Sequence, residues 1–120
     1  MLKDSSELKQ ETVFGLRGGD GEVQITHYLE VEKDEFSGKG RLFAKNVLKP
    51  GSSIGFHDHV GDFETYMILS GIGQVNDNGE MKDIKAGDVI VTRNGEKHGI
   101  KNTGTEDLVF IALILFEDNK

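Results

Sequence analysis

Three histidines and one glutamate are spaced so that their side chains could meet around a metal ion. His57 and His59 are two positions apart, so both imidazoles project from one face if this segment is a strand. Glu64 would face the other way on a straight strand, but the break at residues 60–62 lets a hairpin return it across from the histidines. His98 follows an Asn-Gly turn and begins another expected strand, from which a third imidazole can enter the same interior.

This set of donor atoms restricts the metals that such a site would prefer. Three imidazole nitrogens and one carboxylate oxygen, without sulfur, suit manganese, iron, nickel, cobalt or zinc. The chain contains no cysteine, which excludes thiolate ligands, disulfides and a cysteine nucleophile. Binding requires neutral imidazoles, so we expect metal affinity to fall below the histidine range near about pH 6.5.

Short strand-like segments separated by turns must position these residues. The chain has 120 residues with 16 glycines and one proline, and the glycines are dispersed as turn residues would be. Strands are expected at residues 22–31, 41–48, 54–59, 64–69, 72–76, 80–85, 88–92, 98–102 and 108–116. Strands at this spacing predict an all-β, antiparallel sandwich or barrel.

Three segments carry further expectations about the architecture. Residues 108–116 are apolar on both faces, which predicts a central strand or a face covered by a subunit partner. Asp77-Asn78-Gly79 predicts a tight hairpin. Residues 1–20 are expected to form an N-terminal arm, with a helical turn or two within 4–14, and residues 21–120 to form a single domain.

Composition argues against several classes of partner. The chain carries 14 basic and 21 acidic residues, a formal charge of −7, which would repel a nucleic acid backbone. It has no apolar run of membrane-spanning length, and its first residues lack the apolar core of a secretory signal. We therefore expect a cytoplasmic protein that binds neither nucleic acid nor membrane.

The spacing of these residues resembles the two sequence motifs of the cupin superfamily. The first motif, residues 51–71, is matched at every specified position: Gly51, His57, His59, Glu64 and Gly71. The second motif, residues 87–102, is matched at Gly87, Asn94, Gly95, His98 and Asn102, with Arg93 in place of the usual proline.

The resemblance implies a small single-domain cupin. Its fold would be a double-stranded β-helix, or jelly-roll barrel, that binds one divalent metal ion (Mn, Fe, Ni, Co or Zn) through His57, His59, Glu64 and His98. Such proteins commonly form homodimers, often with the N-terminal strand added to the partner's sheet. The glycines of the motifs and Asn102 are expected to be structural.

The superfamily contains several kinds of function, and the sequence leaves them open. A metal held by four protein ligands in octahedral geometry keeps two positions free for a chelating substrate or water. The leading hypothesis is an isomerase or lyase acting on a small oxygen-rich molecule, such as a sugar, keto-sugar or hydroxy or keto acid. The alternatives are an iron-dependent dioxygenase and a non-catalytic protein that binds or senses a small ligand.

Three other side chains have two interpretations each. Tyr66 points inward by parity with Glu64, so it could bind substrate or transfer a proton, or simply pack in the core. His27 lies on the apolar face of the first expected strand, as a core or interface residue or as a further ligand. Arg93 is expected to restore a backbone donor in its turn, or to reach an anionic substrate at the barrel mouth.

Overall fold

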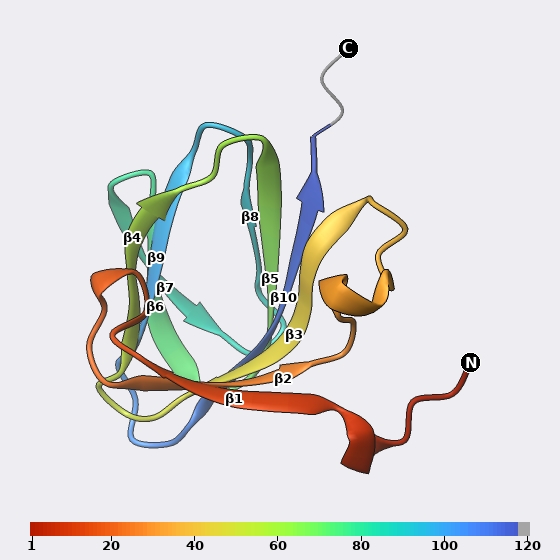
Figure 1. The fold of residues 1–120 in the computed structure, drawn as a ribbon. Coiled ribbons are helices and arrows are strands. Elements are labelled where there is room, and N and C mark those ends of the chain that lie inside the picture. Colours follow the sequence, from red (N-terminus) through yellow and green to blue (C-terminus); the bar gives the residue numbers. More distant parts are fainter. Residues whose placement is uncertain (118–120) are drawn as a thin grey trace.

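Two antiparallel sheets face each other and enclose the space into which the predicted ligands point (Figure 1). In this computed structural model, which describes residues 1–117, the strands are β1 Lys9–Phe14, β2 Glu22–His27, β3 Gly40–Leu48, β4 Ser53–Asp58, β5 Asp62–Ser70, β6 Ile72–Asp77, β7 Glu80–Lys85, β8 Val89–Thr92, β9 Lys97–Asn102 and β10 Leu108–Phe116. One sheet has the order β1-β2-β3-β10-β5-β8, and the other has the order β4-β9-β6-β7. The predicted all-β jelly-roll barrel is confirmed.

Helical structure in the described residues is limited to three single turns. These are the 3-10 helices η1 Ser5–Glu7, η2 Leu16–Gly18 and η3 Val31–Lys33. No helix among residues 1–117 is long and apolar enough to cross a membrane. Residues 118–120, the end of the predicted domain 21–120, lie outside the described part of the chain.

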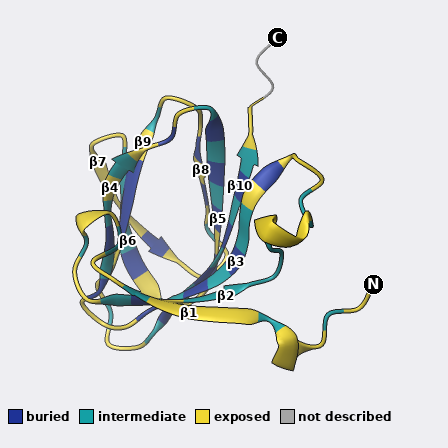
Figure 2. Ribbon diagram, in the orientation of Figure 1, coloured by how far each residue is buried: buried dark blue, intermediate teal, exposed yellow. Residues whose placement is uncertain are grey.

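Alternation along the strands sends apolar side chains into the barrel. On β5, Glu64, Tyr66 and Ile68 are buried while Met67 is exposed, as the parity of the sequence predicts. Burial is concentrated on the inner faces of both sheets, whereas β1 is exposed along almost its whole length (Figure 2). The site is therefore built on the rigid, buried strands.

Tight turns connect the strands where the glycine pattern places them. Asn78 and Gly79 both have positive φ, 54° and 96°, and join β6 to β7 as the predicted two-residue hairpin. Asn102 is also structural, because its amide donates to the carbonyls of Leu48 and Glu106 at 2.8 and 2.7 Å. These contacts hold the end of β9 against the turn that leads into β10.

The N-terminal residues differ from the expectation. A helical turn is confined to Ser5–Glu7, where the Asp4 carboxylate caps the backbone of Ser6. The expected helical segment instead continues as β1, a tenth strand that pairs with β2 along its whole length. Pairing with a neighbouring strand outweighs a weak helical propensity in a segment this polar.

The first expected strand is shorter than predicted. It ends at His27 rather than residue 31, and η3 follows. The Glu35 carboxylate accepts hydrogen bonds from the backbone of Glu30 at 2.8 Å and from Lys3 at 2.6 Å, which folds the chain back on itself here. The contact between Lys3 and Glu35 joins residues 32 positions apart. The alternation of residues along the strand therefore cannot predict it.

The doubly apolar segment 108–116 occupies the predicted central position. β10 lies between β3 and β5, and its alternate residues are fully buried or half-buried. The half-buried residues lie on the outer face of the six-stranded sheet: Val109, Ile111, Leu113 and Leu115.

Candidate metal centre

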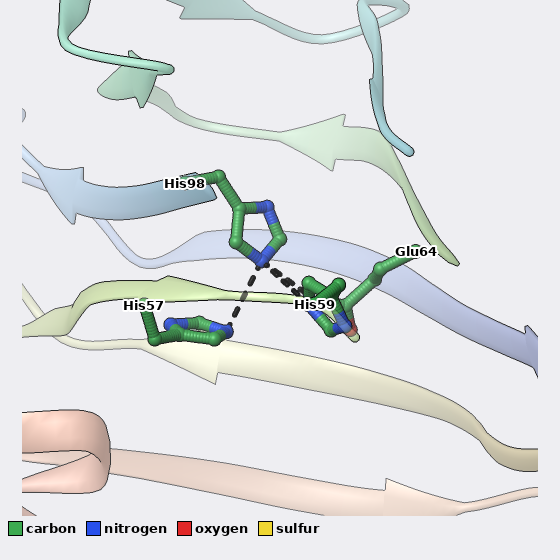
Figure 3. A group of neighbouring side chains, drawn as sticks. All are labelled: His57, His59, Glu64 and His98. Carbon is green, nitrogen blue, oxygen red and sulfur yellow. Dashed lines mark hydrogen bonds and ion pairs between the residues drawn. The ribbon is translucent and has the colours of Figure 1, made fainter. Parts of the chain in front are cut away.

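The four predicted ligands come together inside the barrel from three strands and one loop. β4 carries His57, β5 carries Glu64, β9 carries His98, and His59 immediately follows β4. His57 and His98 are directly opposite each other in the β4–β9 pair. Figure 3 shows the imidazole of His98 above those of His57 and His59, with the Nε2 atoms turned toward one another and Glu64 beside His59.

The donor atoms lie at the separations that a single ion would impose. His98 Nε2 is 3.2 Å from His57 Nε2 and 3.1 Å from His59 Nε2, and it is 3.0 Å from Glu64 Oε1. His59 Nε2 is also 3.0 Å from that oxygen. All four donor atoms lie within 4.8 Å of one another, close enough to surround a single ion.

Each imidazole is oriented by a hydrogen bond at its other nitrogen. The Nδ1 partners are the carbonyl of Gly55 for His57 at 2.7 Å, the carboxylate of Asp62 for His59 at 2.7 Å, and the hydroxyl of Thr92 for His98 at 2.8 Å. A carbonyl or carboxylate partner favours a proton on Nδ1, which leaves the Nε2 lone pair available to a metal, whereas the Thr92 hydroxyl can donate or accept. The three rings are thus oriented so that one metal ion could contact all of their Nε2 atoms.

Asp62, the partner of His59, also forms an ion pair with Arg41. Arg41 Nε donates to the Asp62 carboxylate at 2.8 Å. Burial alone would raise the pKa of Asp62, but its contacts with Arg41 and His59 outweigh burial and lower it. Asp62 consequently stays ionised, and it holds the His59 ring in place.

Burial and the contacts among the clustered residues shift the pKa values of Glu64, His59 and His57. Burial alone would raise the pKa of Glu64, but hydrogen bonds with His59 and His98 lower it to about 2. Glu64 raises the pKa of His59, and Asp62 adds to this effect against the opposing influence of burial. Burial lowers the pKa of His57. The carboxylate is therefore ionised at neutral pH, as a metal ligand must be.

A cavity of ≈ 180 Å³ opens onto the cluster. His57, His59, Glu64 and Tyr66 form its inner wall, together with apolar residues. Its charged lining otherwise consists of Arg17 and Arg41, although the whole chain carries a charge of −7. The cavity therefore presents cations beside the candidate metal position.

Tyr66 lies in this cavity wall, as the sequence predicts. Its ring stacks on His98 with 4.9 Å between centroids and packs against Phe110 at 4.7 Å. Burial raises the pKa of Tyr66 well above its usual value, and the charge of Glu64 raises it further. The phenol is thus protonated at neutral pH and remains a candidate proton donor.

His27 and Arg93 lie away from the cluster. His27 Nε2 pairs with Glu11 of β1 at 2.5 Å and lines no part of the cavity. Arg93 is exposed, and its backbone N–H donates to the Glu96 carboxylate at 2.8 Å. The backbone N–H that arginine has and the motif proline lacks is therefore hydrogen-bonded within the turn. The Arg93 side chain does not line the cavity.

Several residues around the site carry no recognisable signal in the sequence. Arg17, Arg41, Asn46, Asp62 and Thr92 line the cavity or contact the ligands. Of these, Asp62 and Thr92 lie within or next to the motifs and could have been suspected as partners of histidine. Arg17 and Asn46 are brought to the cavity only by tertiary structure.

The chain is similar to known proteins over almost its whole length. The chain is 50% identical over 115 residues, 96% of its length and 93% of the relative's, to a protein of Thermotoga maritima called an oxalate-binding protein. It is also similar to the crystal structure of a predicted oxalate decarboxylase from the same organism, with 49% identity, a TM-score of 0.90, and coverage of 98% of this chain and 100% of the other.

More distant structures share the fold. A putative sugar phosphate isomerase from Acidithiobacillus ferrooxidans has 20% identity and a TM-score of 0.73, over 98% of this chain and 76% of the other. The family model described as a cupin domain matches residues 46–114, which include all four clustered residues. The chain therefore belongs to the cupin family.

Proposed function

We propose that this protein binds a small dicarboxylate such as oxalate at a divalent metal ion held by His57, His59, Glu64 and His98. The observation that carries the proposal is the convergence of three Nε2 atoms and one carboxylate oxygen within 4.8 Å of one another, beside a small cavity lined by arginine. When bound, the ion would supply a Lewis acid, which suits a chelating ligand.

The size and charge of the cavity favour a small anion over a sugar. A cavity of about 150 Å³ can hold benzene, which has as many non-hydrogen atoms as oxalate, and this cavity measures ≈ 180 Å³. Arg17 supplies positive charge at its wall, whereas the charge of Arg41 is paired with Asp62. The resemblance to an oxalate-binding protein supports the same ligand class.

Ligand binding by the metal-loaded protein tests this proposal. We expect elemental analysis of untagged protein to find one divalent ion per chain, and titration calorimetry to detect oxalate binding. Removal of the metal with a chelator should abolish the heat of binding and its return should restore it. Metal-loaded protein that gives no heat with oxalate would contradict the proposal.

Lyase chemistry at the same site is a second candidate, supported by Tyr66. Cleavage of the carbon–carbon bond of hydrogen oxalate yields carbon dioxide and formate, and the new C–H bond requires a proton. The Tyr66 ring lies in the cavity wall beside the cluster and stacks on His98, although burial makes its phenol a weaker acid than an ordinary tyrosine. Formate release by the wild type but not by Tyr66→Phe would support this candidate, whereas oxalate binding without formate release would leave a binding protein.

We also propose that the protein is a homodimer. Exposed apolar side chains cover neighbouring positions on the outer face of the six-stranded sheet: Met67, Leu69, Val89 and Val91. They continue into the half-buried outer face of β10, where Ile111 is opposite Met67. An apolar face this continuous favours contact with a second copy of the chain.

A further inference from the structure

The loop between β1 and β2 is pressed against the strand that carries His57. Figure 1 shows this loop beside β4. A Cβ atom on Gly19 would lie 2.2 Å from the carbonyl oxygen of Ser53, and one on Gly55 would lie 2.0 Å from the carbonyl oxygen of Arg17. Both positions therefore require glycine, because any other residue would separate the loop from β4.

Hydrogen bonds fix the same loop from both ends. Ser53 N–H donates to the Asp20 carbonyl and the Ser53 hydroxyl accepts from Asp20 N–H, each at 2.8 Å. Within the loop, Gly18 and Gly19 N–H donate to the carbonyls of Gly15 and Leu16 at 2.9 Å. The backbone on both sides of Arg17 is thereby held in one position.

Arg17 itself has a backbone conformation that arginine rarely adopts. Its φ is 54° and its ψ is 30°, in the left-handed region. Residues other than glycine that adopt this conformation are often found at functional sites. Arg17 is exposed, lines the cavity, and forms none of the ion pairs found within residues 1–117.

We propose that Arg17 forms a recognition subsite that holds the part of a dicarboxylate ligand facing away from the metal. Its guanidinium would pair with carboxylate oxygens that the metal leaves free. The subsite selects a dianion over a monocarboxylate of similar size. This inference rests on the proposed function.

The test compares oxalate with glycolate by calorimetry on metal-loaded variants. We expect Arg17→Gln to weaken oxalate binding at least tenfold and glycolate binding much less, and Arg17→Lys to recover part of the loss. Arg93→Gln is the matched control, because it removes an arginine that lies outside the cavity. Gly19→Ala leaves every charge in place but moves the loop, so it should reproduce the Arg17→Gln loss.

The outcomes distinguish the subsite from the proposed function. Wild-type protein that does not bind oxalate contradicts the proposed function itself. Wild-type protein that binds oxalate, with Arg17→Gln equal to Arg93→Gln, overturns the subsite and leaves the proposed function intact. Loss of metal from Arg17→Gln would also overturn the subsite, because Arg17 would then act on the metal centre.

Discussion

At the scale of single residues, the centre depends on which nitrogen of each histidine faces the cluster. The Nδ1 atoms are occupied by three unrelated partners, a carbonyl, a carboxylate and a hydroxyl. Their common effect is to direct all three Nε2 atoms to one point. The motif spacing indicates which side chains meet, whereas the orienting contacts involve backbone and side chains that the spacing does not specify.

Removing one ligand should remove most of the metal affinity. We expect His57→Ala to lower the affinity for the divalent ion at least about 100-fold, because even the loss of an orienting partner costs about 10- to 100-fold. His27→Ala is the matched control, since it removes a histidine that lies outside the cluster. Metal content and affinity are measured after dialysis, and equal values for the two variants would contradict the assignment.

Metal affinity should also depend on pH. Protons and metal compete for Nε2, and the pKa of His59 is raised by Glu64, so His59 begins to protonate above the usual histidine range. Between about pH 8 and about pH 5, affinity should fall as pH decreases, by up to about tenfold per pH unit for each protonating imidazole. Glu64, with a pKa of about 2, stays ionised throughout.

Competition with a chromophoric chelator at each pH measures this dependence, and circular dichroism checks that the fold persists. An affinity that is constant over this range would show that the imidazoles do not bind the ion.

At the scale of elements, turns set where each strand starts and hence which face a ligand occupies. Glu64 reaches the interior because β5 starts at Asp62, after the break that follows β4. A shift by one residue would turn Glu64 and Tyr66 outward. The glycine motifs predict these turns well, since Gly71 and Gly87 both have positive φ, 90° and 93°.

The two glycines should nonetheless differ in their tolerance of alanine. A Cβ on Gly71 would lie 2.5 Å from the carbonyl oxygen of Asp107, whereas one on Gly87 meets nothing within 4 Å. Gly87→Ala should lower the free energy of unfolding by about 1 kcal/mol, through its φ alone. Gly71→Ala should lower it by about 2 kcal/mol or more, because the backbone must also move. Urea unfolding measures both, and equal losses would contradict the close approach at Gly71.

Elements formed by long-range contacts were less predictable. For residues 4–14 the sequence predicts only a helical turn or two, from a possible N-cap at Asp4 or Ser5. Lys9–Phe14 form the strand β1 because β2 offers a free edge for pairing. The early end of β2 likewise depends on Glu35 and Lys3, which come from separate parts of the chain.

At the scale of the whole molecule, charge and apolar surface are unevenly distributed. The chain has a net charge of −7, yet arginines from the β1–β2 loop and from β3 line the cavity. A local field of this sign can attract an anion despite the overall charge. The exposed apolar residues lie instead on the outer face of the larger sheet.

The homodimer proposal predicts the effect of charges on that outer face. Wild-type protein should be a dimer by light scattering at micromolar concentration, and the double variant Met67→Lys, Val89→Lys should be a monomer, because two buried lysines oppose association. These residues are cross-strand neighbours. Met81→Lys is the matched control, an exposed methionine on the other sheet that should leave the dimer intact. A monomeric wild type would contradict the proposal.

The sequence by itself determined the parts that depend on local pattern. Alternation fixes which side chains face inward, glycines fix the turns, and the spacing of three histidines and one glutamate identifies the cluster. Only the tertiary structure decided which residues surround that cluster. Arg17 reaches the cavity from the β1–β2 loop, and Arg41 and Asn46 reach it from β3. The contacts that bring these two segments together join distant parts of the chain, so no periodic pattern in the sequence predicts them.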